Sequence, residues 1–239
     1  MPWLKNSFLV NCFTAHHLQG GFLTAKQDEA YGKFKEAIFN RSFKPGQFLT
    51  QAEIVKKLDI SLGPLRDAMK RLEWEELILV IPQRGLQIAL PNIMNIKEAF
   101  QVRIILEKEA VRCFTRSPSQ TILEKLETAT RELAGKRPNS FPDNGILSNA
   151  LDVEIALHVT LINEMKNVLL RNFYQVVFDK VRLAWLATSY TQEIVQPVME
   201  EHLEIISAIR CGEPEKSAMA MEKHLILSLR RIMGVSEHL

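Results

Sequence analysis

The sequence predicts a mainly α-helical protein: an N-terminal winged helix-turn-helix with a two-stranded wing, followed by an all-α helical bundle. Three observations support this fold class. Apolar residues recur at helical spacing through most of the chain, short turns join three N-terminal helices, and two β-prone runs flank a glycine turn. We expect a flexible arm at residues 1–25, the winged helix at 26–91 and the all-helical domain at 92–239.

The first two helices have clear boundaries. Apolar residues at helical spacing predict a helix over residues 28–39, and the following "KPG" predicts a turn. Thr50 is placed to cap a short second helix, and Glu53, three residues later, completes a capping box. A short turn segment therefore joins the two predicted helices.

The third helix and the wing follow directly. Ser61 is placed to cap the third helix, and Pro64 falls in its first turn, where a missing N–H is tolerated. The runs "ILVIP" and "LQIAL" are separated by "QRG", which predicts a β-hairpin. This order of helices and strands is that of a winged helix.

Beyond Asn92 the apolar pattern is helical almost throughout. Short polar or proline-containing breaks divide it into segments. We expect helices near residues 93–116, 119–134, 147–164, 166–190, 194–210 and 214–233.

Composition excludes several classes of protein. The 239 residues are 46% hydrophobic and 24% charged, as in a globular chain, and no apolar run approaches the roughly 20 residues that span a bilayer. The three cysteines are widely spaced without a CxxC pair, so neither a disulfide framework nor a cysteine zinc site is indicated. We expect a cytoplasmic protein without membrane partners.

The outer face of the predicted third helix carries Arg66 and Lys70. A recognition helix presents such residues to the DNA major groove, and arginine fits the guanine edge. At the predicted wing tip, Arg84 and the flexible Gly85 could approach the DNA backbone and minor groove. A solvated surface face is the alternative interpretation, but helix-turn-helix and basic wing together favour DNA binding.

Three histidines and one carboxylate of the bundle suggest a metal site. Glu154 and His158 are four residues apart and share one helix face, while His202 and His224 lie in the middle of two later helices among apolar residues. If all four converge, they suit a divalent transition metal: zinc or nickel first, with manganese or iron also acceptable. Buried histidines that each make one hydrogen bond are the alternative.

Residues 30–90 resemble the winged-helix domain of the GntR family of bacterial transcription regulators. The family pattern runs helix, "PG..L", helix, "lgvSR.PvReAL..L..eGl" and a wing "..rG..V". The residues that match it are Pro45, Gly46, Leu49, Leu58, Ser61, Pro64, Arg66, Ala68, Leu72 and Gly85. This resemblance implies double-stranded DNA as a partner.

The chain departs from the family where DNA contacts are expected. The positions concerned hold Ala52, Leu62 and Gly63. Base reading would then rest on Arg66, with Ser61 and Lys70 on phosphate and Arg84 and Gly85 at the wing. We therefore expect a weaker or altered sequence preference.

Residues 96–228 resemble the FCD ligand-binding domain that follows the winged helix in the FadR subfamily. The resemblance implies a metal site formed by His158, His202 and His224, with Glu154 in place of the usual aspartate. It also implies a small organic acid as effector, and Arg103 is a candidate contact for it. An ion pair between Arg103 and Glu107 at i,i+4 is the alternative role of that arginine.

Together with the two resemblances, these features lead us to expect an effector-controlled repressor that binds a palindromic operator as a homodimer. A metal-dependent, hydrolase-like enzyme is the rival, but no HExxH, GxSxG or other catalytic motif is present, and we expect no enzyme. A regulator whose bundle binds a larger metabolite without metal is a third interpretation.

Overall fold

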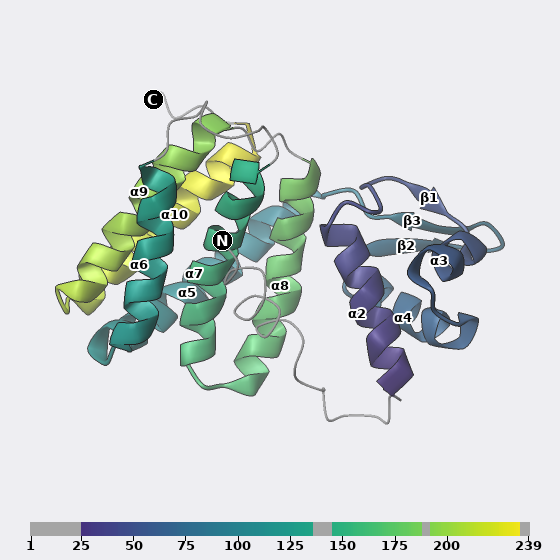
Figure 1. The fold of residues 1–239 in the computed structure, drawn as a ribbon, viewed down its shortest axis with the longest axis horizontal. Coiled ribbons are helices and arrows are strands. Elements are labelled where there is room, and N and C mark those ends of the chain that lie inside the picture. Colours follow the sequence, from purple (N-terminus) through teal and green to yellow (C-terminus); the bar gives the residue numbers. More distant parts are fainter. Residues whose placement is uncertain (1–24, 136–144, 188–191, 235–239) are drawn as a thin grey trace. The chain divides into compact units, whose positions relative to one another are not determined.

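The computed structural model describes residues 25–135, 145–187 and 192–234, and these are mainly helical (Figure 1). The predicted fold class and the six predicted bundle helices are confirmed, whereas the arm expected at residues 1–25 lies outside the described residues except for Ala25. The elements in chain order are α2 (Ala25–Phe39), β1 (Phe48–Leu49), α3 (Gln51–Leu58), α4 (Leu62–Trp74), β2 (Ile78–Ile81), β3 (Gly85–Ile88), α5 (Ile93–Arg116), α6 (Gln120–Ala134), α7 (Gly145–Glu164), α8 (Val168–Ala187), α9 (Gln192–Arg210) and α10 (Pro214–Ile232).

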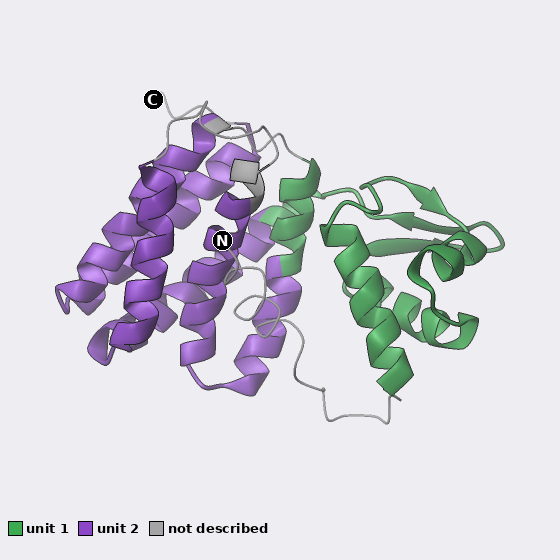
Figure 2. Ribbon diagram, in the orientation of Figure 1, with its two compact units in different colours: residues 1–96, 179–188 green, residues 97–178, 189–239 purple. Residues whose placement is uncertain are grey.

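The chain forms two compact units, which are coloured separately in Figure 2. The first unit comprises residues 1–96 and 179–188, and the second comprises residues 97–178 and 189–239. Helix α8 crosses the division, so its last residues are counted with the winged helix.

Of the two N-caps predicted in the first unit, the one at α3 forms as predicted and the one at α4 does not. The capping box at α3 is confirmed, because Glu53 N–H donates to Thr50 Oγ1 (3.3 Å) and Thr50 N–H donates to Glu53 Oε2 (2.7 Å). At α4, Ser61 occupies the N-cap position, but its side chain makes no capping hydrogen bond within the described chain. The expected side-chain cap is wrong: Pro64 at N3 has no N–H to donate, and the Gly63 N–H at N2 is not bonded to the Ser61 side chain.

The wing is larger than expected. The predicted hairpin forms from β2 and β3, but the short strand β1 adds to it, giving a three-stranded antiparallel sheet in the order β1-β3-β2. Gly85 opens β3 with φ +110°, and a Cβ there would lie 2.3 Å from the Leu49 carbonyl oxygen. Strand β1 therefore fits against β3 only because residue 85 is glycine.

A single apolar core holds the first unit together. It includes side chains from all three helices, from the sheet and from the end of α8. Its buried members include Phe34, Ile38, Phe43, Ile54, Leu65, Leu72, Leu77, Leu86, Ile88 and Leu183.

A buried polar network lies beside this core. Lys35 on α2 donates to the Tyr31 hydroxyl (2.7 Å) and to Glu75 Oε2 (2.9 Å), and it also pairs with Asp179 on α8. Burial alone would lower the pKa of Lys35, but Asp179, Tyr31 and Glu75 together outweigh burial and raise that pKa. The network thus fixes a charged lysine between α2 and the end of α8.

The second unit is a helical bundle. Buried apolar residues on α6, α7 and α9 form one cluster: Ala129, Leu133, Ala150, Val153, Val195, Val198 and Met199. Ion pairs join α5 to α10 at the surface, where Arg112 lies 2.9 Å from Glu215 and Lys108 pairs with Glu222. None of the described helices is long and apolar enough to cross a membrane.

Candidate functional site

Four side chains predicted as metal ligands meet in the interior of the second unit. Glu154 and His158 come from α7, His202 from α9 and His224 from α10. The three histidines are fully buried and Glu154 is 2% exposed. One ligand atom from each residue lies within 4.8 Å of the others, which is a separation that a single ion can bridge.

The Glu154 carboxylate lies among the three imidazoles. Its Oε1 is 3.2 Å from His158 Nε2 and 3.6 Å from His224 Nε2, and its Oε2 is 2.9 Å from His202 Nε2. The Nε2 atoms of His158 and His224 are 3.1 Å apart. All three Nε2 atoms therefore point toward one carboxylate.

The donor set fits a metal ion. His202 Nε2 and Glu154 Oε2 lie 2.9 Å apart, and beyond each other neither atom has a hydrogen-bond partner among the described residues. Buried polar atoms without partners are costly, and a cation that accepts both lone pairs would satisfy them. Three nitrogen donors and one oxygen donor suit zinc and other first-row divalent ions.

Carboxylates behind two of the histidines fix their orientation. His158 Nδ1 contacts Glu107 Oε2, and His224 Nδ1 lies 2.8 Å from Glu201 Oε2. Arg231 holds Glu201 in turn, with Nη1 3.0 Å from Oε2. A carboxylate on Nδ1 places the ring proton there and leaves Nε2 free to bind a metal.

Electrostatics at the cluster keep the carboxylate ionised. Burial would raise the pKa of Glu154, but the three imidazoles outweigh it and hold that pKa well below its usual range. Burial lowers the pKa of His202 to about 4, so this ligand is neutral at pH 7. Burial would also lower the pKa of His224, but Glu154 and Glu201 outweigh it and raise that pKa to about 9. A metal that binds near pH 7 must therefore displace a proton from His224.

Arg103 lies next to this cluster and is fully buried. Its Nε donates to Glu107 Oε1 (2.6 Å), which also accepts from the Tyr174 hydroxyl (2.8 Å). The ion pair considered from the sequence is thus present. Burial would raise the pKa of Glu107, but Arg103 and His158 outweigh it and lower that pKa to about 2.

Sequence reasoning missed three residues of this site. Glu107 was considered only as a partner of Arg103, and its contact with His158 was not foreseen. Tyr174 and Glu201 were not considered at all. The i,i+4 spacing of Arg103 and Glu107 predicts an ion pair between them, whereas no spacing links Tyr174 or Glu201 to the cluster.

The candidate DNA-contacting residues lie in the first unit. Arg66 and Lys70 are exposed on α4, whose opposite face is buried, and Lys70 Nζ is 3.4 Å from Asp67 Oδ1. Ser61 is exposed at the start of the same helix, and Arg84 is exposed in the turn between β2 and β3. The structure thus places Arg66 and Lys70 on α4 and Ser61 at the N-cap of that helix.

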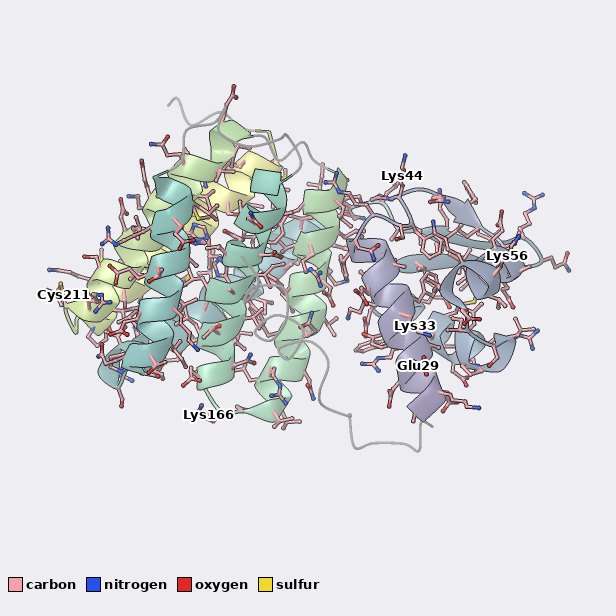
Figure 3. The ribbon with its side chains drawn as sticks, viewed as in Figure 1. Glu29, Lys33, Lys44, Lys56, Lys166 and Cys211 are labelled. Atoms are coloured by element: carbon pink, nitrogen blue, oxygen red, sulfur yellow. The ribbon has the colours of Figure 1, made fainter. Side chains whose placement is uncertain are left out.

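Two further features of the first unit bear on DNA contact. Gly85 is half-buried, and its positive φ serves the close approach to β1 described above. Lys56 on α3, labelled in Figure 3, is an exposed cation that the sequence reasoning did not include.

Two matches to known families decide what kind of protein this is. Residues 26–88 match the family described as "Bacterial regulatory proteins, gntR family", and residues 98–227 match the FCD domain. The chain belongs to the GntR family. It is a transcription regulator of that family and carries an FCD domain, as the sequence resemblance implied.

Individual relatives of this GntR-family protein are distant but nearly full-length. It is 24% identical over 196 residues to an uncharacterised HTH-type transcriptional regulator, YdhC, of Bacillus subtilis. The aligned residues cover 82% of this chain and 84% of that protein. It is 21% identical over 212 residues to the HTH-type transcriptional repressor GlaR of Escherichia coli. The aligned residues cover 85% of this chain and 94% of GlaR. A crystal structure of a putative transcriptional regulator GntR from Rhodococcus sp. RHA1 has the same fold, with a TM-score of 0.76, 19% identity, and coverage of 90% of this chain and 100% of that one.

Proposed function

We propose that this protein is a cytoplasmic bacterial repressor that binds a palindromic operator as a homodimer and responds to a small carboxylate held at a metal site. In this proposal residues 26–91 read DNA and residues 92–239 bind the effector and dimerise. The arrangement that supports it best is the buried set of Glu154, His158, His202 and His224, whose donor atoms lie within 4.8 Å of one another. We also propose that the set binds a ligand and does not catalyse a reaction.

The metal would be held by those four side chains, with zinc or nickel as the first candidates and manganese or iron also compatible. Once bound, it would supply a Lewis-acid anchor for a carboxylate oxygen. Glu107 and Glu201 would keep two of the histidines facing it through their contacts with Nδ1. An effector can act only if it binds one arrangement of the two winged helices better than the other.

On the DNA side, we propose that Arg66 reads a base edge, that Ser61 and Lys70 contact phosphate, and that Arg84 and Gly85 bring the wing to the backbone. The exposure of Ser61, Arg66, Lys70 and Arg84 supports this assignment. The Ser61 hydroxyl is not used in capping α4 within the described chain, which leaves it suited to a phosphate oxygen. Because each subunit would make few base contacts, specific binding would depend on two subunits contacting two symmetric half-sites.

Selection of bound fragments from the source genome tests the proposal. The intact protein should enrich a palindrome at moderate salt. Arg66→Ala should lose that enrichment, because one bidentate arginine contact supplies roughly 1–3 kcal/mol of discrimination. Arg116→Ala, which removes an arginine that is 59% exposed at the end of α5, is the matched control and should enrich the same sequence.

Two results would count against this assignment. Salt-sensitive binding without sequence preference would show that the protein lacks specific recognition. A palindrome that Arg66→Ala still enriches would show that another residue reads it.

A further inference from the structure

The outer face of the winged-helix sheet carries exposed apolar side chains. Phe48, Gln87 and Leu79 lie side by side across the three strands, because Gln87 on β3 pairs with Phe48 on β1 and with Leu79 on β2. Phe48 is 66% exposed and Leu79 is 55% exposed, whereas the other face of the sheet is buried in the core of the first unit. Leu90, two residues after the end of β3, is 64% exposed. Three large apolar side chains of this region therefore face solvent in the described part of the chain.

An open cleft of about 420 Å³ lies at this face, and all of its lining residues belong to the first unit. Leu79 and Leu90 contribute apolar walls, and Glu73 contributes a carboxylate from the end of α4. Glu73 Oε1 accepts from the Val80 N–H (3.2 Å), but no lysine or arginine among the described residues pairs with it. A second carboxylate of the lining, Glu76, is already paired with Lys180. The cleft thus suits an apolar segment that carries one positive charge.

The N-terminal arm of the same chain contains such a segment. In residues 3–13, "WLKNSFLVNCF", seven of the eleven side chains are hydrophobic and Lys5 is the only charged one. Residues 1–24 contain neither aspartate nor glutamate, so the arm brings no charge that Glu73 would repel. Removing the apolar side chains of both surfaces from water favours their contact.

The connection between this segment and α2 is long enough to reach the cleft. Near the start of α2, Gln27 Nε2 donates to Asp67 Oδ2 (2.5 Å) on α4. Glu73 is six residues further along α4, which is about 9 Å at the helical rise of 1.5 Å per residue. The eleven residues 14–24 can extend over about 35 Å. Because a short tether gives an effective concentration of about 1 mM or more, the cleft on the same chain is favoured over that of a second copy.

We propose that residues 3–13 bind the outer face of the winged-helix sheet of their own chain, with Lys5 facing Glu73. The bound segment covers Phe48, Leu79 and Leu90 and makes the N-terminal arm part of the DNA-binding unit. This inference does not depend on the metal site or on the effector.

Photocrosslinking from the arm tests this inference on the full-length protein. Phe8 is replaced by p-benzoylphenylalanine, equal amounts of ¹⁴N- and ¹⁵N-labelled protein are mixed and irradiated without DNA, and the crosslinked peptides are identified by mass spectrometry. We expect crosslinks to residues 46–49 and 77–90 within chains of one isotope. Crosslinks that join the two isotopes would assign the face to a second copy and overturn the proposal. Crosslinks to the helical bundle alone, or none to this face, would also overturn it.

Two surface variants test the apolar contact. Leu79→Lys should lower the equilibrium constant for docking, and with it the crosslink yield, by about tenfold or more, because one leucine no longer leaves water and the arm is cationic. Lysine is well tolerated on an exposed strand, and circular dichroism checks that the fold is kept. Leu169→Lys, at a leucine that is 81% exposed at the start of α8, is the matched control and should crosslink like the intact protein. Equal yields from the two variants would refute the proposed contact.

The pairing of Lys5 with Glu73 has its own test. Glu73→Gln keeps an oxygen that can accept from the Val80 N–H but removes the charge. Glu73→Gln and Lys5→Gln should each lower the docking equilibrium constant by about two- to fivefold, as expected for an exposed ion pair. The double variant should lose no more than either single variant. Strictly additive losses would show that the two residues do not pair.

Discussion

Replacement of Glu107 by glutamine tests how the candidate metal site is supported. This buried carboxylate contacts Arg103, Tyr174 and His158 at once. Glutamine keeps the size of the side chain but removes its charge, so Arg103 loses its buried counter-ion. Removing one partner of a buried ion pair costs about 3–5 kcal/mol in the free energy of unfolding.

The same change should weaken metal binding. The amide nitrogen of glutamine can donate to His158 Nδ1, which favours the tautomer that carries its proton on Nε2. Because Nε2 is the atom that faces Glu154, a proton there blocks it as a ligand. Loss of such a supporting contact lowers metal affinity by about 10- to 100-fold.

Two assays separate these effects. Urea unfolding of the metal-free protein measures stability, and competition with a coloured chelator measures zinc affinity. Glu222→Gln is the control, because it neutralises a half-exposed carboxylate that pairs with Lys108 at the surface. It should cost about 0–1 kcal/mol and leave zinc affinity unchanged. Our reasoning about Glu107 is wrong if Glu107→Gln unfolds at the same urea concentration as the intact protein and binds zinc equally well.

Three other predictions follow from the structure. His224 has a folded-state pKa of about 9, above its usual 6.5, so its contribution to the stability of the metal-free protein is complete below pH 6.5 and is lost as pH rises through 9. Zinc binding at pH 7.5 should accordingly release about one proton, seen by calorimetry in two buffers of different ionisation enthalpy, and binding without proton release would contradict this assignment. Asp179→Asn should destabilise the protein by about 1.5–3 kcal/mol in urea unfolding, because Lys35, whose side chain is 13% exposed, loses one of its two carboxylate partners and keeps Glu75, and an unchanged midpoint would refute it. Gly85→Ala should lower the free energy of unfolding by about 1–3 kcal/mol or more, because residue 85 has a positive φ and lies close to the backbone of β1. The control Gly32→Ala lies within α2, has no described atom within 4 Å of the added Cβ, and should raise the free energy of unfolding by up to about 1 kcal/mol. Equal thermal midpoints for the two variants would argue against the wing geometry.

Much of the fold could be predicted because its signals are local. The capping box at Thr50 and the "KPG" turn act over a few residues, and helical periodicity marked the bundle helices. Strand β1 could not be predicted, since two residues have no usable periodicity and the strand exists only through pairing with β3. The side-chain cap at Ser61 is absent, and Pro64 removes one of its two possible N–H donors.

The candidate site was predictable only in part, for a similar reason. His158, His202 and His224 were found through their helical positions and apolar neighbours. The carboxylates behind them depend on how helices pack, because Glu107 is 51 residues from His158 and Glu201 is 23 residues from His224. Spacing along one helix cannot report such contacts.

The central claim is that a carboxylate at the metal site controls DNA binding. The most direct measurement is the affinity of the zinc-loaded protein for its selected operator, followed by fluorescence anisotropy with and without each member of a panel of small carboxylates. The His202→Ala variant is measured in the same way. We predict that at least one carboxylate weakens operator binding by the intact protein, and that His202→Ala binds the operator with similar affinity but no longer responds. An intact protein whose operator affinity no carboxylate changes, or a His202→Ala variant that responds equally, would contradict the claim.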